Sequence, residues 1–394
     1  MKKIRCNTIC KKYLIFIIIM IALFLPMLQG VFQLFNLVPL KGAFHKKELP
    51  KFNEITAKSF LNNEFQTKLE SNLNNYIGFY NFFIKVNNQI DFSLFRKTST
   101  KDILLGKEGY LFRKSGNVSY NGLDYVGDKI IKEKTKKLKF IVDELNKDGV
   151  KLLVVIAPNK RSFYQEFLPE KSISTKNRKT NYAEYKKQLD LLNIKYLNLE
   201  EYFLENKNHE YPLYSKCGIH WTQYGAAFAF DTIVGFMEKF GNISMPKITF
   251  DKIYSKKPWA PDVDLQNSMN LLFDLPEKQL YYPKLSYKSD SNTVKPNTIV
   301  IADSYYHAIQ WTGMPKGAFS QESAFWYYNK SGFTPDNKKY KVDEIDYEKA
   351  IFDSDFIILF GTTTNFVRFS YGFVEQAYDL LLSKSEKDDF KNLK

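Results

Sequence analysis

A single long apolar segment near the N-terminus constrains the fold of this chain more than any other feature. From Tyr13 to Phe35 the only polar side chains are those of Gln29 and Gln33, and no residue in this segment is charged. This length matches the roughly 20 residues that an α-helix needs to cross the apolar core of a bilayer. A cleavable signal peptide usually has a shorter apolar core, roughly 7–15 residues, and then a small-residue cleavage site, for which no clear pattern follows here. We therefore predict a transmembrane anchor over residues 13–35.

Basic residues on one side of this segment predict its orientation. They all precede the apolar segment: Lys2, Lys3, Arg5, Lys11 and Lys12. By the positive-inside rule, residues 1–12 stay in the cytoplasm and the chain after residue 35 is exported. We expect a single-pass protein of a bacterial cell membrane with an extracytoplasmic, periplasmic domain. Cys6 and Cys10 then lie inside and Cys217 alone outside, so no disulfide is expected within the exported part.

The formal net charge of +14 comes from lysines that are scattered along 394 residues, with one cluster at the N-terminus. A positive net charge of this size favours binding to nucleic acid, anionic lipid or acidic polysaccharide. The sequence has no zinc-finger spacing, no RNA-recognition motif and no dense arginine run, so we do not expect a nucleic-acid role.

The exported chain has two parts. Residues 36–98 are predicted to form a helical connector, because apolar residues recur at spacings of three and four between Phe60 and Ile90. Residues 99–394 alternate predicted strands with predicted helices and begin with a hairpin over residues 102–112. Amphipathic helices are expected over residues 129–149, 182–194 and 222–241, and buried strands over residues 150–158, 296–302 and 355–361. This alternation predicts an α/β domain with a parallel sheet flanked by helices.

Polar side chains follow each of the three buried strands, in "APNKRSFY", "ADSYYHA" and "GTTTNF". In parallel sheets, active sites gather at the carboxyl ends of the strands. Ser304 at such a strand end could expose its hydroxyl as a nucleophile, with its own N–H as an oxyanion donor. Asp303 and Ser304 after a strand are also typical of a helix N-cap, and the local sequence alone favours the cap.

His220, in "KCGIHWTQYGA", has several interpretations. A histidine beside Trp221 at a helix start is often a packed core residue. A metal site is not expected, because Cys217 is the only other ligand at suitable spacing. A Cys217 nucleophile served by His220 is a further alternative, although nothing nearby marks an activated thiol. His307, one turn past Ser304, is a second candidate base.

The order of these motifs is more informative than any one of them. From about Gly106 to Phe366, "GKEGYLF", "PNKRSFYQEFLP", "GIHWTQYGA" and "ADSY" together resemble the SGNH-hydrolase-like acetyltransferases that modify exopolysaccharides, of the alginate O-acetyltransferase AlgJ/AlgX type. The resemblance implies an SGNH-like fold in which Ser304 is the nucleophile and His220 the base. In the family's Asp-x-His-Trp motif an aspartate orients the imidazole, and here that position is Gly218.

The missing aspartate leaves three possibilities open. The acid could come from Asp262 or Asp264 in "APDVDLQNSMNLL", a backbone carbonyl could orient a Ser–His dyad, or the protein could bind glycan without catalysis. Gly218→Asp would restore the family arrangement and is expected to be tolerated. Asn159 and Lys160 are expected to line the acceptor site, and Asn365 to donate to an oxyanion or orient a loop, with loop capping as the alternative for each.

The resemblance also implies the reaction and its partners. We expect O-acetylation of a cell-surface or secreted polysaccharide through an acyl-enzyme on Ser304. The acetyl donor would be delivered by a multi-pass O-acyltransferase in the membrane, and no metal or organic cofactor is expected. An acetylesterase and a non-catalytic glycan-binding or assembly subunit are the alternative functions.

Overall fold

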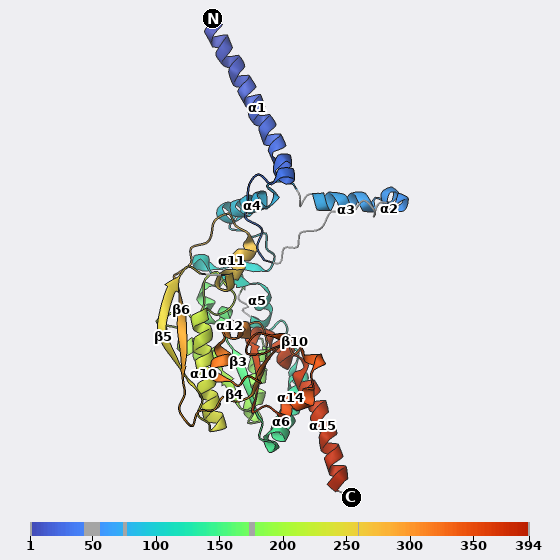
Figure 1. The fold of residues 1–394 in the computed structure, drawn as a ribbon, viewed down its shortest axis with the longest axis vertical. Helices are drawn as coiled ribbons and strands as arrows, with labels where there is room; N and C mark the ends of the chain where they lie inside the picture. The colour runs from blue at the N-terminus through green and yellow to red at the C-terminus, as the bar shows by residue number, and fades with distance from the viewer. Residues whose placement is uncertain (1, 43–55, 74–76, 173–177, 259, 393–394) are drawn as a thin grey trace. The chain divides into compact units, whose positions relative to one another are not determined.

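The protein is described by a computed structural model of residues 2–42, 56–73, 77–172, 178–258 and 260–392 (Figure 1). The chain divides into two compact units. The first comprises residues 1–100 and 266–274, and the second comprises residues 101–265 and 275–394. The predicted connector, residues 36–98, falls within the first unit, although its residues 43–55 and 74–76 lie outside the described part. Sequence patterns did not indicate that residues 266–274 belong to this unit.

The first unit contains the apolar helix. Helix α1 spans Lys2–Phe32, and its stretch Lys11–Phe32 is long and apolar enough to cross a membrane. The helix ends at Phe32 rather than Phe35, because Gln33 adopts a left-handed conformation with φ 51°. The Gln29 side chain then stabilises the helix end, since its amide donates to the Phe35 carbonyl and accepts from the Phe35 N–H, both at 2.8 Å. The remaining helices of this unit before residue 100 are α2 (Ala57–Leu61), α3 (Glu64–Leu73) and α4 (Tyr80–Phe95).

The second unit is built on a seven-stranded sheet with the strand order β10-β9-β8-β7-β11-β3-β4. The five strands from β8 to β4 are parallel, and β9 and β10 add an antiparallel edge. The strands are β3 (Lys151–Ala157), β4 (Tyr196–Asn198), β7 (Thr298–Ala302), β8 (Ala324–Tyr327), β9 (Ser331–Phe333), β10 (Lys339–Lys341) and β11 (Phe356–Thr362). This confirms the predicted α/β class and the predicted parallel sheet.

Strand β3 is an almost unbroken apolar run because both of its faces are buried. Leu153 and Val155 pack into one hydrophobic core, and Leu152 and Val154 pack into a second core on the opposite face. Successive side chains of a strand point to opposite faces, so a strand covered on both sides is apolar at every position. Helix α10 (Gln223–Gly241) covers one face and α6 (Asp128–Lys147) the other (Figure 1).

Smaller helices, one hairpin and one further antiparallel strand pair complete the second unit. The other α-helices are α5 (Ser115–Tyr120), α7 (Lys160–Phe163), α8 (Asn181–Leu191), α9 (Leu199–Glu205), α12 (Tyr306–Trp311), α13 (Met314–Ala318), α14 (Tyr347–Phe352) and α15 (Phe373–Asn392). Helix α11 (Asp264–Met269) begins in this unit. The hairpin is β1 (Ile103–Leu105) with β2 (Leu111–Arg113), as predicted. Strand β5 (Lys247–Lys256) pairs antiparallel with β6 (Leu280–Lys288).

The topology brings the predicted polar strand ends together. Strands β7, β11 and β3 are consecutive in the sheet and parallel, so their carboxyl ends lie at one edge. Ser304 follows β7, Asn365 follows β11, and Asn159 follows β3.

Candidate active site

The turn after β7 presents Ser304. The Asp303 carboxylate accepts a hydrogen bond from the Tyr305 N–H at 3.0 Å, which closes the turn before α12. Ser304 does not cap this helix, although the local sequence favoured that interpretation; its hydroxyl contacts His220 instead. The Ser304 backbone N–H makes no hydrogen bond to the residues that the structure describes, so it is free to bind an oxyanion.

Asp303 links this turn to the loop after β11 by hydrogen bonds. The carboxylate is fully buried. Its Oδ2 accepts hydrogen bonds from the Thr362 N–H at 2.9 Å, the Thr362 hydroxyl at 2.7 Å, the Asn365 amide at 2.8 Å and the Tyr371 hydroxyl at 3.2 Å. Asn365 thus bonds to Asp303, which accords with the loop-orienting role among its two predicted roles.

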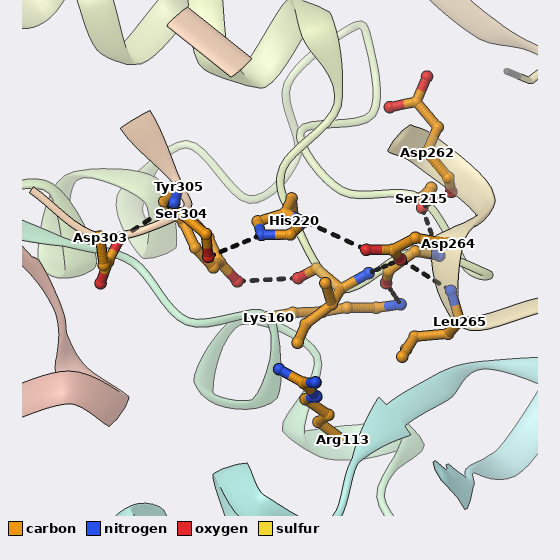
Figure 2. Close-up of polar contacts among 12 residues, drawn as sticks. Arg113, Lys160, Ser215, His220, Asp262, Asp264, Leu265, Asp303, Ser304 and Tyr305 are labelled. Atoms are coloured by element: carbon orange, nitrogen blue, oxygen red, sulfur yellow. Dashed lines mark hydrogen bonds and ion pairs between the residues drawn. The ribbon is translucent and has the colours of Figure 1, made fainter. Parts of the chain in front are cut away.

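Ser304, His220 and Asp264 form a continuous chain of hydrogen bonds (Figure 2). The Ser304 Oγ lies 3.1 Å from His220 Nε2, and His220 Nδ1 lies 3.2 Å from Asp264 Oδ2. The His220 and Asp264 side chains are 25% and 33% exposed, so the chain of bonds is open to a substrate at one side. A hydroxyl, an imidazole and a carboxylate in this order can activate the hydroxyl for nucleophilic attack.

Two backbone N–H groups fix which oxygen of Asp264 faces the histidine. The Ile219 and Leu265 N–H groups donate to Asp264 Oδ1 at 2.9 and 2.8 Å, which leaves Oδ2 for His220. The second candidate acid, Asp262, is buried, and its carboxylate accepts from the Tyr282 hydroxyl at 2.6 Å. Its side chain points away from His220 in Figure 2. The structure therefore brings Asp264, and not Asp262, to the histidine.

A side chain at Gly218 would collide with the loop that carries Asp262 and Asp264, which we call the acidic loop. A Cβ at this position would lie 2.5 Å from the Asp262 carbonyl oxygen and 2.7 Å from Ser215 Oγ. Ser215 Oγ itself bridges the two segments, since it donates to the Asp262 carbonyl at 2.6 Å and accepts from the Gly218 N–H at 2.8 Å. The expectation that Gly218→Asp is tolerated is therefore wrong, because the backbone of the acidic loop occupies the space.

Lys160 stabilises the loop that precedes His220, which we call the histidine loop. Its ammonium donates to the carbonyls of Leu111, Lys216 and Gly218 at 2.9, 2.7 and 2.6 Å. Burial lowers the pKa of this ammonium to about 7. A lysine has three N–H donors, and all three are used here. Lys160 was expected to line the acceptor site; it lines the cavity beside Ser304, where its ammonium donates to protein backbone.

Asn159 and Glu200 shape the start of α7. The Asn159 side chain accepts from the Arg161 N–H at 2.9 Å, and the Asn159 N–H donates to Glu200 Oε2 at 2.7 Å. Burial raises the pKa of the Glu200 carboxyl to about 7. The Asn159 side-chain oxygen therefore caps α7, in line with the capping alternative. Asn159 also lines the cavity beside Ser304.

This cavity, which we call the polar cavity, has a volume of ≈ 250 Å³. Ser304 and His220 lie in its wall, together with three arginines. Arg113 and Arg368 are exposed and Arg161 is buried, and among the described residues that line the cavity none is acidic. Arg113 pairs with Asp102 at 2.8 Å, and Arg368 donates to the Asn365 side chain at 3.1 Å. The cavity therefore presents positive charge and polar atoms to the nucleophile.

The two alternative reactive groups lack suitable geometry. The Cys217 thiol is buried, and burial raises its pKa to about 12, so it stays protonated and unreactive. Burial, followed by repulsion from His220, lowers the pKa of His307 to about 4. The hydrogen bond to Ser304 comes from His220. Within the described part of the chain, no group of three or more His, Cys, Asp or Glu side chains could hold a metal ion.

Comparison with known proteins agrees with the resemblance seen in the motifs. Residues 103–259 match the family model of the SGNH hydrolase-like domain of the acetyltransferase AlgX. The matched residues lie in the second unit, which is therefore similar to this SGNH hydrolase-like domain. No curated protein sequence matches the chain.

Several solved structures are similar at low sequence identity. The O-acetyltransferase domain of Pseudomonas putida AlgJ has a TM-score of 0.46 and 15% identity, and covers 70% of this chain and 98% of its own. Bacillus cereus PatB1 with a sulfonyl adduct has a TM-score of 0.46 and 13% identity, and covers 69% of this chain and 99% of its own. Pseudomonas aeruginosa AlgX has a TM-score of 0.42 and 14% identity, and covers 69% of this chain and 67% of its own.

Proposed function

We propose that this protein is a membrane-anchored O-acetyltransferase that acetylates a cell-surface or secreted polysaccharide through an acyl-enzyme on Ser304. The observation that carries the proposal is the hydrogen-bonded series from Ser304 through His220 to Asp264, with distances of 3.1 and 3.2 Å. A glycan-binding subunit would not need a carboxylate that is oriented toward an imidazole, so this geometry favours catalysis over binding alone.

The reaction runs in two half-reactions. His220 Nε2 takes the proton of Ser304 as Oγ attacks the acetyl carbonyl, and it returns that proton to the leaving oxygen of the donor. A sugar hydroxyl then attacks the acyl carbon while His220 takes its proton. The bond from that carbon to Ser304 Oγ breaks, and His220 returns the proton to Oγ. Asp264 keeps the Nδ1 proton on His220 and stabilises the imidazolium that forms in each half-reaction. The free Ser304 N–H donates to the oxyanion in both transition states.

The wall of the polar cavity supports a glycan acceptor. Arg113 and Arg368 present cations beside Ser304 without an acidic residue among the described lining. Guanidinium groups bind carboxylates and phosphates in a bidentate manner, so an acceptor with anionic substituents fits this cavity. A sugar hydroxyl would enter from this side.

Membrane anchoring supports an extracytoplasmic acceptor. The apolar part of α1, Lys11–Phe32, follows the basic N-terminal residues. We propose a cytoplasmic N-terminus, an extracytoplasmic catalytic domain and an acetyl donor that is delivered by a multi-pass O-acyltransferase in the same membrane. An alkaline phosphatase fused after Lys394 should then be active; an inactive fusion at a normal expression level contradicts this orientation.

Acyl transfer is tested by locating the acetyl group. The full chain in detergent is incubated with p-nitrophenyl acetate and its peptides are analysed by mass spectrometry. We expect acetyl on the peptide that contains Ser304, and none in Ser304→Ala. Acetyl on Cys217, or labelling that survives Ser304→Ala, contradicts the proposal.

The fate of the acetyl group on the same acyl-enzyme distinguishes a transferase from an esterase. The acyl-enzyme is mixed with the de-O-acetylated surface polysaccharide of the source bacterium, or with buffer alone. A transferase loses its acetyl group faster with the polysaccharide and leaves ester on sugar hydroxyls. Equal release as free acetate in both samples indicates an acetylesterase.

A further inference from the structure

Ser304 and His220 border a second cavity of different character. This apolar cavity, of ≈ 100 Å³, is formed by α12 and by the segments around His220 and Pro261. Its lining is almost wholly apolar, in contrast to the polar cavity on which the same two residues open. Besides Ser304 and His220, the residues that line it are Trp221, Gln223, Pro261, Asp262, His307, Ala308, Trp311 and Thr312, and most of the surface that they present is apolar.

The outer wall of the apolar cavity is a fixed aromatic surface. The Trp311 ring stacks on His307 with centroids 4.3 Å apart and an interplanar angle of 19°. His307 in turn packs edge-on against Phe325 and Phe333. Trp311 remains 60% exposed, so this part of the lining also meets solvent. Because His307 is neutral near pH 7, the stacked pair adds no charge to this wall.

Acyl transfer at Ser304 has one component that is purely hydrocarbon. The attacking and leaving oxygens and the oxyanion are polar and match the polar cavity. The alkyl part of the acyl group gains free energy only where it leaves water for an apolar surface. We propose, on the basis of the acyl-enzyme function above, that the apolar cavity binds this alkyl part and admits acyl groups longer than acetyl.

The volume supports an acyl group larger than acetyl. A methyl group is about the size of a water molecule, which needs roughly 10–15 Å³ of such cavity volume. An acetyl group places one methyl beyond its carbonyl, so a cavity of ≈ 100 Å³ has room for further carbons. Each methylene that becomes buried should raise the acylation rate about fourfold. A chain that extends past Trp311 returns to solvent, where the increase should stop.

The step conserves atoms and protons for every chain length. Ser304 Oγ forms a bond to the acyl carbon, and the bond from that carbon to the donor oxygen breaks. The Ser304 proton passes through His220 Nε2 to that oxygen. Water then attacks in the absence of a glycan, and the carboxylic acid leaves.

The test uses p-nitrophenyl acetate, propionate, butyrate and hexanoate with the full chain in detergent. Each kcat/KM is divided by the spontaneous hydrolysis rate of the same ester. We expect an increase of about fourfold from acetate to propionate, a further increase to butyrate and a plateau at hexanoate. A steady fall from acetate to butyrate overturns the proposal.

Two variants locate the effect. Ala308→Leu narrows the cavity and should lower the ratio of butyrate to acetate rates at least tenfold, whereas Trp311→Ala removes a wall and should flatten the series. Ala350→Leu is the matched control, since Ala350 is a half-buried helical alanine on α14 and should leave the ratio unchanged. Equal losses for all esters in Ala308→Leu contradict the cavity assignment. Absence of any acyl-enzyme, or activity in Ser304→Ala, contradicts the proposed function instead.

Discussion

Replacement of Asp264 by asparagine should reverse the proton arrangement of His220. In the structure, Asp264 Oδ1 accepts hydrogen bonds from the Ile219 and Leu265 N–H groups at 2.9 and 2.8 Å. An asparagine must keep its carbonyl oxygen at that position, because its NH₂ group cannot accept either bond. The NH₂ group then takes the place of Oδ2, 3.2 Å from His220 Nδ1, and donates to it. His220 must now carry its proton on Nε2, which faces Ser304.

The magnitude follows from the loss of the base. A histidine with its proton on Nε2 cannot accept the Ser304 proton, and the same tautomer reversal costs about 10⁴-fold in turnover in a serine protease. This corresponds to about 5 kcal/mol of transition-state stabilisation. We expect Asp264→Asn to lower the acylation rate with p-nitrophenyl acetate by about 10³- to 10⁴-fold while the fold remains intact.

The matched control is Asp262→Asn. Asp262 lies two residues away, and its carboxylate accepts from the Tyr282 hydroxyl, a bond that an amide oxygen preserves. We expect its acylation rate to stay within a few-fold of wild type. If Asp264→Asn retains activity while His220→Ala loses it, the carboxylate is dispensable and a Ser–His dyad operates. If His220→Ala and Ser304→Ala also retain activity, the proposed acyl-enzyme is wrong.

Three further predictions concern the residues that support the site. Gly218→Ala should destabilise the fold by about 1–3 kcal/mol in urea unfolding, because its Cβ would lie 2.5 Å from the Asp262 carbonyl; a neutral effect contradicts this packing. Lys160→Met should destabilise by at least about 2 kcal/mol and lower acylation, since three backbone carbonyls lose their donors; unchanged stability and activity would show that water replaces the ammonium. The pKa of the Glu200 carboxyl is raised by burial from 4.5 to about 7, so the folded state binds its proton more tightly than the unfolded state. Its contribution to stability is present below about pH 4.5 and is lost as pH rises toward 7, by roughly 1.4 kcal/mol per pH unit. Glu200→Gln should therefore flatten the decline in stability between pH 4.5 and 7, and an unchanged slope would assign it to other groups.

The sequence predicted the sheet and its main helices because their patterns are local. An apolar run such as residues 151–157 can be buried on both faces only in a covered sheet, and α6 and α10 carry the spacing of amphipathic or buried helices. The alternation of these patterns is sufficient for the parallel α/β class. The pairing of residues 266–274 with the first unit depends on contacts between distant segments, which no local pattern records.

Two of the predicted site residues were indicated by their positions in the sequence. Ser304 was predicted from its strand end and His220 from its motif, and the structure brings the two side chains together. The choice between Asp262 and Asp264 could not be made, because it depends on a 3₁₀ turn over Ala260–Val263 that directs successive carboxylates in different directions.

Lys160 shows a second limit of sequence reasoning. A lysine in a polar loop after a strand suggested contact with a substrate, but the carbonyls of the histidine loop needed its donors. The support that Asp303 gives to Thr362, Asn365 and Tyr371 was also missed. The adjacency of Asp303 to Ser304 and the polar "TTTN" after β11 were the available signals for it.

Gly218 and Asp264 are two consequences of one backbone arrangement. The chain around Asp262 packs directly against Gly218, with the Asp262 carbonyl 2.5 Å from the position that a Cβ would occupy. The same packing brings Asp264 Oδ1 to the Ile219 N–H and Oδ2 to His220. A side chain at position 218 would push this loop away and remove the carboxylate from the histidine. A residue-by-residue comparison with the family motif therefore reports a missing acid, although the loop that excludes an aspartate at 218 is the loop that supplies one from Asp264.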